Sequence, residues 1–537
     1  MHTGVGHQLG VSLLLALAGL LAHASTARCD VRVPAFVADH MVLQREMPVN
    51  LWGWAAPGER VAVTIAGQTK TTPAGADGVW RVRLEPMPAG GPHVLRIEGE
   101  NEIVVNDVLI GEVWLCSGQS NMEWRMRATS DYQQDRPQAD TPLIRTFVVE
   151  DRVWFTEPQQ ELAGRWIVCS PDTVGAFSGV AYYFARKLHA ETGLAVALLD
   201  TAQGGTRIES FTCLDIRARH PEIEPVYREL VKRTIDEWTP ARARAKYEKR
   251  LKKWETRAEN ERKKGKTPTG KPIWEPTKVK RPVLKSGVWN GMIAPLVGYT
   301  LRGAVWYQGE SNGFGAWYYR YQLPIMIEDW RRRWGQGDFP FGIVQLHPVA
   351  NELSDKPGAY TCKALIREAA LLTCRETPNT GLAVAADAGD PHGPRPAHPP
   401  FKKPVGERLA LWALHTVYGR HAVVFSGPLY KGHRIEGDKI VIEFEHTDGG
   451  LVAKGDSAKL AGFAVAGADR KWYWADARRA GNTVLVSSPA VGAPVAVRYG
   501  WANVPIANLY NGHGLPAATF RTDDWPTGYA CGRFGNP

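Results

Sequence analysis

A serine flanked by two amides, Gln119-Ser120-Asn121, follows an apolar run that ends at a glycine turn. The run Val113–Cys116 predicts a buried strand. A serine placed on a turn after such a strand can present its hydroxyl to a bound molecule, because open α/β sheets bind ligands at strand ends. The alternative is that Ser120 only caps a following helix, since serine is a favoured N-cap residue. This stretch alone does not decide between a nucleophile and a cap.

Acyl transfer by a serine requires a base for its proton, a group that orients the base, and donors for the developing oxyanion. Three later turns carry residues of these types. The first is Gly204-Gly205, where the missing side chains allow a backbone N–H to approach an oxyanion closely. The second contains Gln308 and Asn312, whose side-chain amides can donate hydrogen bonds. The third leads to His398, which is a candidate base.

Three carboxylates lie on or near these turns. Asp387 and Asp390 precede the histidine and are candidates for the residue that orients it. Glu310 lies in the second turn, and with either aspartate it can be interpreted as the carboxylate pair of a glycosidase. A glycosidase requires neither Ser120 nor the double glycine, so we favour the serine mechanism. The chain has no GxSxG motif, which disfavours an α/β-hydrolase in the strict sense.

The segments that must position these residues alternate between apolar strands and helices. Strands are predicted at VLIGEVWLCSG, LAVALLD, LRGAVWYQG, FGIVQL and TGLAVAADAGD. The segment Val180–Gly193 has apolar residues at helical spacing and a glycine as its C-terminal stop. This alternation predicts an α/β fold with a parallel sheet and crossover helices. Because the carboxyl ends of parallel strands meet at one edge, we expect the polar turns to converge there.

Both ends of the chain have the character of β-domains. Residues 31–107 are short alternating segments separated by turns such as Ala56-Pro57-Gly58, which predicts a small antiparallel sandwich. Residues 421–537 again contain short strands, so a second β-rich domain is expected there. The domain that carries the polar turns is therefore expected at 108–420.

The first 24 residues predict a cleaved export signal. An apolar run, Val11–Leu21, precedes Ala22-His23-Ala24, which is a small-x-small cleavage pattern. The run is too short to span a bilayer, and no later stretch is long and apolar enough. We therefore expect a secreted or periplasmic protein without a membrane span.

The net charge of +10 is concentrated in one segment. Residues 241–285 contain 17 Lys and Arg against 5 Glu, and the rest of the chain is slightly acidic. Apolar residues recur in this segment at helical spacing, which predicts a solvated basic helix within an insertion at about 215–285. An alternative is a patch that attracts acidic glycans or a cell surface. The distribution of charge argues against a nucleic-acid partner.

Several other residues have structural interpretations. The seven cysteines show no CxxC spacing, so no metal site is indicated. Arg207 and Glu209 are expected to hold the loop after the double glycine by ion pairing. His392 lies in a Pro/Gly-rich loop and is expected at the surface or at the rim of the substrate site. Lys402 and Lys403 are expected to cap or flank the helix that follows His398.

Five segments together resemble the sialate O-acetylesterase family of SGNH-type hydrolases: WLCSGQSNMEW, QGGTRIESF, NGMIAPL, WYQGESN and HPPFKKPVGERLALWAL. The resemblance extends to MVLQREMPVNLWGWAAPGE near the start and to NLYNGHGLPAATFRTD near the end, so it covers nearly all of the chain. It implies an SGNH-like fold, an O-acetylated carbohydrate as substrate, and neither a metal nor an organic cofactor.

The resemblance also implies roles for particular residues. Ser120 would be the nucleophile and His398 the base. The oxyanion would be held by the Ser120 backbone N–H, by a glycine of Gly204-Gly205, and by the side chain of Gln308 in preference to that of Asn312. We expect three further residues to line the substrate site: Gln119, Asn121 and Glu310.

The orienting acid departs from the family pattern. Many SGNH hydrolases carry Asp two or three residues before the histidine, where this chain has Pro396 and Arg395. Asp387, which closes an apolar strand, is therefore the expected acid, and Asp390 is the alternative. On this assignment Asp387→Asn cripples activity and Asp390→Asn does not.

The expected function is that of a secreted serine esterase that removes O-acetyl groups from carbohydrates. The resemblance implies O-acetylated sialic acid as the substrate, and acetylated xylan or another plant polysaccharide is the nearest alternative. An alternative of another class is a non-catalytic carbohydrate-binding protein on a hydrolase scaffold, which the absent Asp spacing keeps open. The sequence indicates no oligomeric state.

Overall fold

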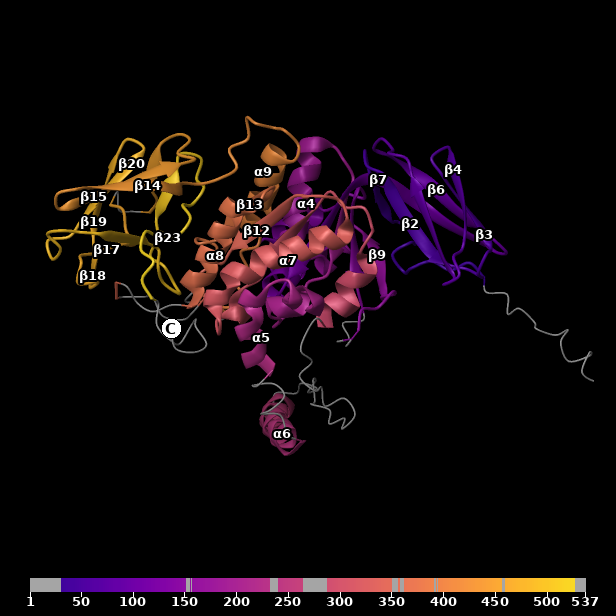
Figure 1. Ribbon diagram of the computed structural model, residues 1–537, viewed down its shortest axis with the longest axis horizontal. Helices are drawn as coiled ribbons and strands as arrows, with labels where there is room; N and C mark the ends of the chain where they lie inside the picture. The colour runs from indigo at the N-terminus through magenta and orange to yellow at the C-terminus, as the bar shows by residue number, and fades with distance from the viewer. Residues whose placement is uncertain are drawn as a thin grey trace, which may run out of the picture.

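The computed structural model of the chain describes residues 30–150, 155, 157–231, 240–263, 287–349, 356–357, 362–390, 393, 395–455 and 459–526. The expected export signal and residues 264–285 of the basic insertion lie outside these ranges. A central layer of sheet and helices lies between N-terminal β-strands, at the right of Figure 1, and C-terminal β-strands, at its left.

A mixed sheet positions the polar turns, and eleven strands of the described residues belong to it. Its central strands follow the order β13-β12-β11-β7-β10-β8 and are all parallel, while β9 adds an antiparallel edge. The predicted α/β class and the predicted parallel strands are thus confirmed. The bounds are β7 (Glu102–Gly118), β8 (Ile144–Val149), β9 (Gly164–Val168), β10 (Val196–Asp200), β11 (Gly303–Tyr307), β12 (Phe341–Gln345) and β13 (Thr380–Val384).

Helices connect the parallel strands and cover the sheet (Figure 1). Helix α4 (Gly179–Thr192) ends at Gly193, whose φ of 70° is the left-handed conformation in which glycine commonly terminates helices. Helix α9 (Lys403–Thr416) packs so closely on α4 that a Cβ on Gly406 would lie 2.4 Å from the Val180 carbonyl oxygen. The other helices are α2 (Ser120–Glu123), α3 (Tyr132–Asp135), α5 (Glu224–Val231), α6 (Pro240–Lys263), α7 (Tyr319–Trp334) and α8 (Cys362–Glu376).

Strand β7 belongs to two parts of the fold. Its first half pairs antiparallel with β6, and its second half pairs parallel with β10 and β11. Four of the N-terminal strands are therefore continuous with the sheet that ends next to Ser120, while the other two, β2 and β5, pair with each other in a separate sheet. The N-terminal strands are β1 (Val42–Gln44), β2 (Val49–Trp54), β3 (Arg60–Ile65), β4 (Gln68–Pro73), β5 (Val79–Leu84) and β6 (Gly90–Glu98).

The C-terminal strands contact the central layer through buried polar groups. The guanidinium of Arg367, on α8, donates to the carbonyl oxygens of Ala502 (2.6 Å) and Asn503 (3.0 Å). These strands are β14 (Leu429–Glu436), β15 (Lys439–Glu445), β16 (Leu451–Ala453), β17 (Phe463–Ala466), β18 (Trp472–Trp474), β19 (Asp476–Ala480), β20 (Thr483–Ser487), β21 (Ala496–Tyr499), β22 (Leu509–Asn511) and β23 (Phe520–Arg521).

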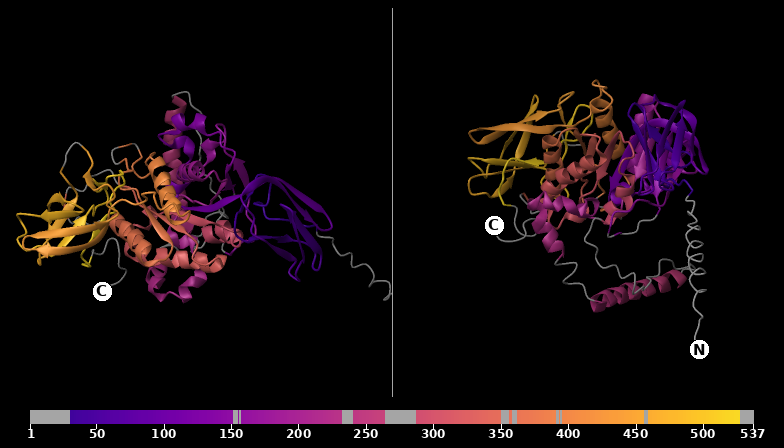
Figure 2. Two further views of the ribbon diagram at one scale, coloured as in Figure 1. Left: turned by 90° about the horizontal axis from the view of Figure 1, so that it is seen from above. Right: turned by 45° about the vertical axis from the view of Figure 1, so that its right-hand side comes forward.

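The basic insertion contains the predicted helix as α6, which stands apart from the central layer in the right-hand view of Figure 2. Its Arg244 and Glu248 form an ion pair one turn apart (2.7 Å), as expected for a charged helix surface. No helix in the described part of the chain is long and apolar enough to cross a bilayer.

Candidate active site

The turn that carries the serine contains a glycine with no room for a side chain. Strand β7 ends at Gly118, whose φ is 139°, and a Cβ there would lie 2.2 Å from the Tyr307 carbonyl oxygen. The N–H of Gln119 donates to the same oxygen (3.0 Å), and helix α2 then begins at Ser120. Gln119 occupies the N-cap position, so the interpretation of Ser120 as a helix cap is wrong.

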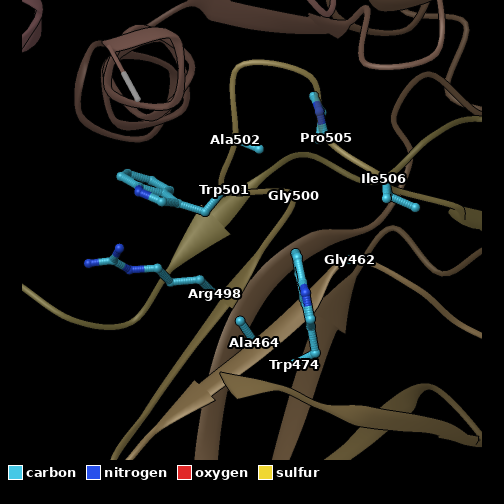
Figure 3. A pocket seen from close by; sticks show the side chains of 9 residues that line it. All are labelled: Gly462, Ala464, Trp474, Arg498, Gly500, Trp501, Ala502, Pro505 and Ile506. Carbon is cyan, nitrogen blue, oxygen red and sulfur yellow. The ribbon is translucent and has the colours of Figure 1, made fainter. Parts of the chain in front are cut away.

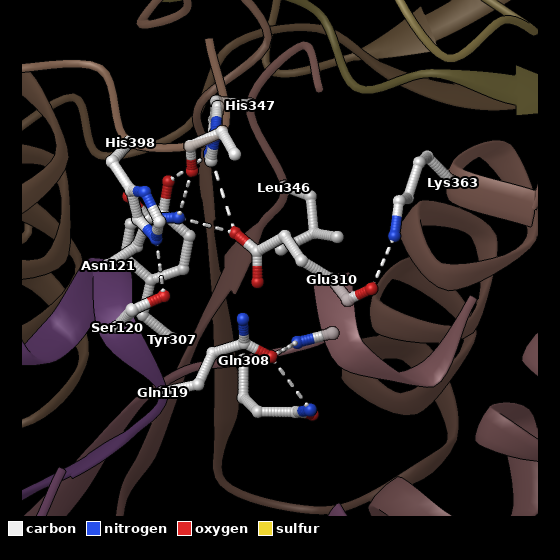
Figure 4. Close-up of polar contacts among 12 residues, drawn as sticks. Gln119, Ser120, Asn121, Tyr307, Gln308, Glu310, Leu346, His347, Lys363 and His398 are labelled. Carbon is white, nitrogen blue, oxygen red and sulfur yellow. Dashed lines mark hydrogen bonds and ion pairs between the residues drawn. The ribbon is translucent and has the colours of Figure 1, made fainter. Parts of the chain in front are cut away.

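Ser120 and His398 meet at the edge of the sheet. The His398 Nε2 lies 2.8 Å from the Ser120 Oγ, which is hydrogen-bond distance (Figure 4). The Trp124 ring stacks on the imidazole with centroids 5.5 Å apart and planes 9° from parallel. Partial burial, together with the charges of Lys402 and Arg395, lowers the pKa of His398. A neutral imidazole at pH 7 is the state that can accept the serine proton.

Neither predicted aspartate contacts the histidine. Asp387 forms a bidentate ion pair with Arg408 (2.6 and 2.8 Å) and accepts a hydrogen bond from the Tyr510 hydroxyl (3.1 Å). Among the described residues, no carboxylate bonds the His398 ring, and the Asp390 side chain has no hydrogen bond. The expected orienting role of Asp387, with Asp390 as alternative, is therefore corrected, because an arginine and a tyrosine occupy the Asp387 carboxylate. His392 lies outside the described residues.

Asp387→Asn is now expected to act on stability. Burial opposes ionisation of Asp387, but hydrogen bonds and the charge of Arg408 outweigh it and lower the pKa of the carboxyl. Removing one partner of such a buried pair costs about 3 kcal/mol, so the urea midpoint at pH 7 should fall. Because the folded-state pKa is lowered, this contribution is present above the unfolded-state pKa and is lost as the pH falls through the folded-state value.

The control is Asp390→Asn, which should change the free energy of unfolding by less than about 0.5 kcal/mol. Urea titrations of the wild type and both variants, at neutral and acidic pH, measure the difference. Equal stability of the two variants would contradict the assignment, as would a deficit in Asp387→Asn that persists at acidic pH.

The double glycine lies against the serine. A Cβ on Gly204 would lie 3.5 Å from the Ser120 Cβ, and the Gly204 N–H donates to the Glu123 Oε2 (2.7 Å). The Gly204 N–H can therefore serve an oxyanion only after this hydrogen bond opens. Gly205 has a φ of 68°, and neither its N–H nor that of Ser120 has an acceptor within the described residues. The N–H groups of Ser120 and Gly205 are therefore the candidate donors that need break no hydrogen bond among the described residues.

Gln308 and Asn312 are buried supports. The Gln308 Nε2 donates to the Asn312 Oδ1 (2.7 Å), the Gln119 Oε1 (3.0 Å) and the Thr206 carbonyl oxygen (3.0 Å). The Asn312 Nδ2 donates to the Glu209 Oε2 (3.1 Å). These contacts occupy the amide protons, so the expected oxyanion role of Gln308, with Asn312 as alternative, is corrected.

Gln119 joins the turn after β7 to the turn after β11. Besides the Gln308 amide, its Oε1 accepts from the backbone N–H groups of Gly309 (3.3 Å) and Ser311 (3.1 Å) (Figure 4). The expected ion pair of Arg207 and Glu209 is confirmed, with a distance of 2.8 Å between nitrogen and oxygen. The three turns are thus tied to one another by side chains before any substrate is bound.

A buried polar cluster lies beside the serine and contains Asn121, Glu310 and Lys402. The Lys402 Nζ donates to the Asn121 Oδ1 (2.6 Å), and the Asn121 Nδ2 donates to the Glu310 Oε1 (2.7 Å). The same Asn121 nitrogen donates to the carbonyl oxygen of Ala397 (3.0 Å), the residue before His398. Asn121 therefore links the helix that carries the nucleophile to the loop that carries the base (Figure 4).

Burial shifts the protonation equilibria of this cluster towards neutral forms. It lowers the pKa of Lys402 to about 7 and raises the pKa of Glu310. His347, which follows β12, also has its pKa lowered by burial, so its ring is neutral. The Tyr307 hydroxyl lies 2.6 Å from the His347 Nδ1, which is hydrogen-bond distance, and burial raises the pKa of the phenol.

Two features of the site were not predicted from the sequence: the contact between Lys402 and Asn121, and the position of His347 beside Tyr307. Lys402 is the N-cap residue of α9, as expected for a residue flanking that helix, but it is almost completely buried. A buried partner for Lys402 could have been predicted from the sequence, because the helix dipole disfavours a cation at a helix N-terminus unless another group stabilises it. His347 follows the apolar strand FGIVQL. The carboxyl end of this strand lies at the sheet edge where the other polar turns converge.

Comparison with known proteins gives concordant results. Residues 110–259 match the family "Carbohydrate esterase, sialic acid-specific acetylesterase". The chain is 35% identical to a carbohydrate acetylesterase from Xanthomonas citri, with a TM-score of 0.76 over 92% of this chain and 100% of that structure. It is 29% identical to the sialate O-acetylesterase of Homo sapiens, over 95% of this chain and 96% of that protein. The corresponding mouse protein is 28% identical over 92% of this chain and 95% of its own length.

Proposed function

Because the chain belongs to the sialate O-acetylesterase family of carbohydrate esterases, we propose that it hydrolyses O-acetylated sialic acids through an acetyl-enzyme on Ser120. The observation that carries the mechanism is the hydrogen bond between the Ser120 Oγ and the His398 Nε2. The finer description of the sheet as SGNH-like, with separate β-domains at 31–107 and 421–537, is part of the same proposal and is supported by the long sequence motifs.

The reaction proceeds in two halves. His398 accepts the Ser120 proton as the Oγ attacks the acetyl carbonyl, and backbone N–H groups at Ser120 and Gly205 stabilise the resulting oxyanion. The imidazolium then protonates the sugar oxygen, and the alcohol leaves the acetyl-enzyme. In the second half His398 deprotonates a water molecule that attacks the acetyl group, and acetate leaves as Ser120 regains its proton.

Among the described residues, the groups that orient His398 include no carboxylate. The Trp124 ring stacks on the imidazole, and the His398 backbone N–H donates to the Arg395 carbonyl oxygen (2.8 Å). The Asn121 side chain donates to the carbonyl oxygen of the residue before His398. The imidazolium that forms during turnover is therefore stabilised less than in a Ser-His-Asp triad. Partial burial and the charges of Lys402 and Arg395 lower the pKa of His398, and no carboxylate among the described residues offsets them.

Acetate release by the mature protein from O-acetylated sialic acid and from acetylated xylo-oligosaccharide tests the function. A faster reaction with the sialic acid supports the proposal, and a preference for the xylo-oligosaccharide moves the substrate to plant polysaccharide. Binding of the deacetylated glycan without acetate release would instead favour a carbohydrate-binding protein.

Export from the cytoplasm is part of the proposal. It is supported by the apolar run and cleavage pattern within residues 1–24. Cys362 is disulfide-bonded, and disulfides persist in oxidising compartments such as the periplasm and the cell exterior. Mass determination of the protein recovered from culture medium or periplasm would show whether the chain begins after Ala24.

A further inference from the structure

Arg395 lies close to the base of the Ser120–His398 pair. Arg395 and His398 lie on one turn, which is closed by a hydrogen bond from the His398 N–H to the Arg395 carbonyl oxygen. The Arg395 guanidinium carbon lies 5.7 Å from the centroid of the Trp124 ring, which itself stacks on the imidazole. Arg395 is exposed, so its guanidinium is accessible to a molecule in solution.

Arg395 has no acidic partner among the residues that the structure describes. Arg408 and Arg207, by contrast, are each paired with an acid. Arg498, at a pocket in the C-terminal strands (Figure 3), is also paired, with Asp523 at 2.7 Å. The guanidinium near the base is thus available to an external anion, and the one at the C-terminal pocket is not.

A positive charge at this position has a cost. After burial and Lys402, Arg395 contributes to the lowered pKa of His398 and so weakens the base. A group that binds to Arg395 and carries a negative charge would offset this effect. Guanidinium groups bind carboxylates through two parallel hydrogen bonds, which are stronger than bonds between neutral groups.

We propose that Arg395 binds the carboxylate of an acetylated sugar acid and thereby selects acidic over neutral substrates. The inference rests on the proposed esterase function and names a specificity-determining residue for it. Sialic acids and hexuronic acids share the required carboxylate, which is fixed to the sugar ring. A bound carboxylate would neutralise the guanidinium and restore basicity to His398 when the acetyl ester is in place.

The test compares free acids with their carboxyl methyl esters. One pair of substrates is O-acetylated sialic acid and its methyl ester, and the other is an acetylated methyl glucuronide and its methyl ester. In the wild type we expect the KM of the preferred free acid to be about tenfold below that of its ester, as a charge-assisted hydrogen bond provides. In Arg395→Met this ratio should fall to about one, and added salt should weaken the preference of the wild type.

The matched control is Arg470→Met. Arg470 is another exposed arginine that lies over a tryptophan, Trp525, at 5.3 Å, but it belongs to the C-terminal region. Arg470→Met should keep the wild-type ratio of KM values between ester and free acid. Arg395→Lys should keep only part of this ratio, because an ammonium group lacks the planar pair of N–H donors of a guanidinium. A wild type that does not distinguish acid from ester, or an Arg395→Met that retains the wild-type ratio, overturns the proposal.

A binding measurement separates this inference from the esterase function. Calorimetric titration of free sialic acid and free glucuronic acid into Ser120→Ala, and into Ser120→Ala with Arg395→Met, needs no turnover. Tighter binding of the sugar acid to the protein that retains Arg395 supports the inference, whether or not an acetylated sugar is hydrolysed. If binding depends on Arg395 but no acetate is released, the esterase function is contradicted and the role of Arg395 is not. Equal binding to both proteins overturns the role of Arg395.

Discussion

Ser120→Ala is expected to lower kcat for acetate release by roughly four to six orders of magnitude, the range seen when a catalytic serine is removed from a hydrolase. The Oγ that His398 contacts is the atom that would attack the acetyl carbonyl, and alanine has no replacement for it. The loss should appear in kcat more than in KM, because the hydroxyl acts in the bond-making step. A coupled acetate assay on O-acetylated sialic acid measures both constants.

Ser117→Ala is the matched control. Ser117 lies on the same strand, β7, and its buried Oγ has no hydrogen-bond partner among the described residues. Its removal should leave activity intact and should not destabilise the fold, since no hydrogen bond is lost. If Ser120→Ala released acetate as fast as Ser117→Ala, a group other than Ser120 would be the nucleophile.

Lys402→Met is expected to lower kcat/KM by about 10²-fold and to change its pH dependence, because small displacements of catalytic groups have effects of this size. Methionine leaves the Asn121 Oδ1 without its donor and so loosens the link between the helix of Ser120 and the loop of His398. With a pKa of about 7, Lys402 is charged at lower pH, and that charge helps to lower the pKa of His398. Its removal therefore raises the pKa of His398, and the acidic limb of the kcat/KM profile moves to higher pH.

Lys403→Met provides the comparison for this profile. Lys403 follows Lys402 in the chain, but its Nζ lies 3.4 Å from Asp135 and it is only partly buried. The acidic limb of the kcat/KM profile of Lys403→Met should coincide with that of the wild type. An unchanged limb in Lys402→Met would mean that the lysine has no electrostatic influence on the base.

The convergence of the turns could be predicted from the sequence, and the partners of each side chain could not. Strand ends in a parallel sheet meet at one edge, so an apolar run ending at Gly118 and another ending near Gln308 indicated neighbouring turns. The proximity of Ser120 and His398 followed from the same rule together with the family resemblance. These features depend on the hydrophobic periodicity of single segments, which the sequence displays directly.

The hydrogen-bond partners depend on residues far away in the chain. Asp387 lies in the turn after β13, which ends at Val384, and its carboxylate is bound by Arg408 on α9 and by Tyr510 in the C-terminal strands. Gln308 has the right chemistry for an oxyanion donor, but the packing of Asn312 and Gln119 around it consumes its amide protons. Such choices are made by tertiary packing, which residue types and spacing in one stretch do not reveal.

The shared strand β7 has a consequence for how the protein folds. It is the first of the six parallel strands to be synthesised, but Trp114 in its centre pairs with Leu198 on one side and Gly303 on the other. Pairings over such sequence distances form slowly, and until they form an apolar strand has open edges that favour aggregation. The serine turn therefore acquires its shape only after most of the chain has left the ribosome. Substitutions in β11 should first be noticed as a lower yield of soluble protein.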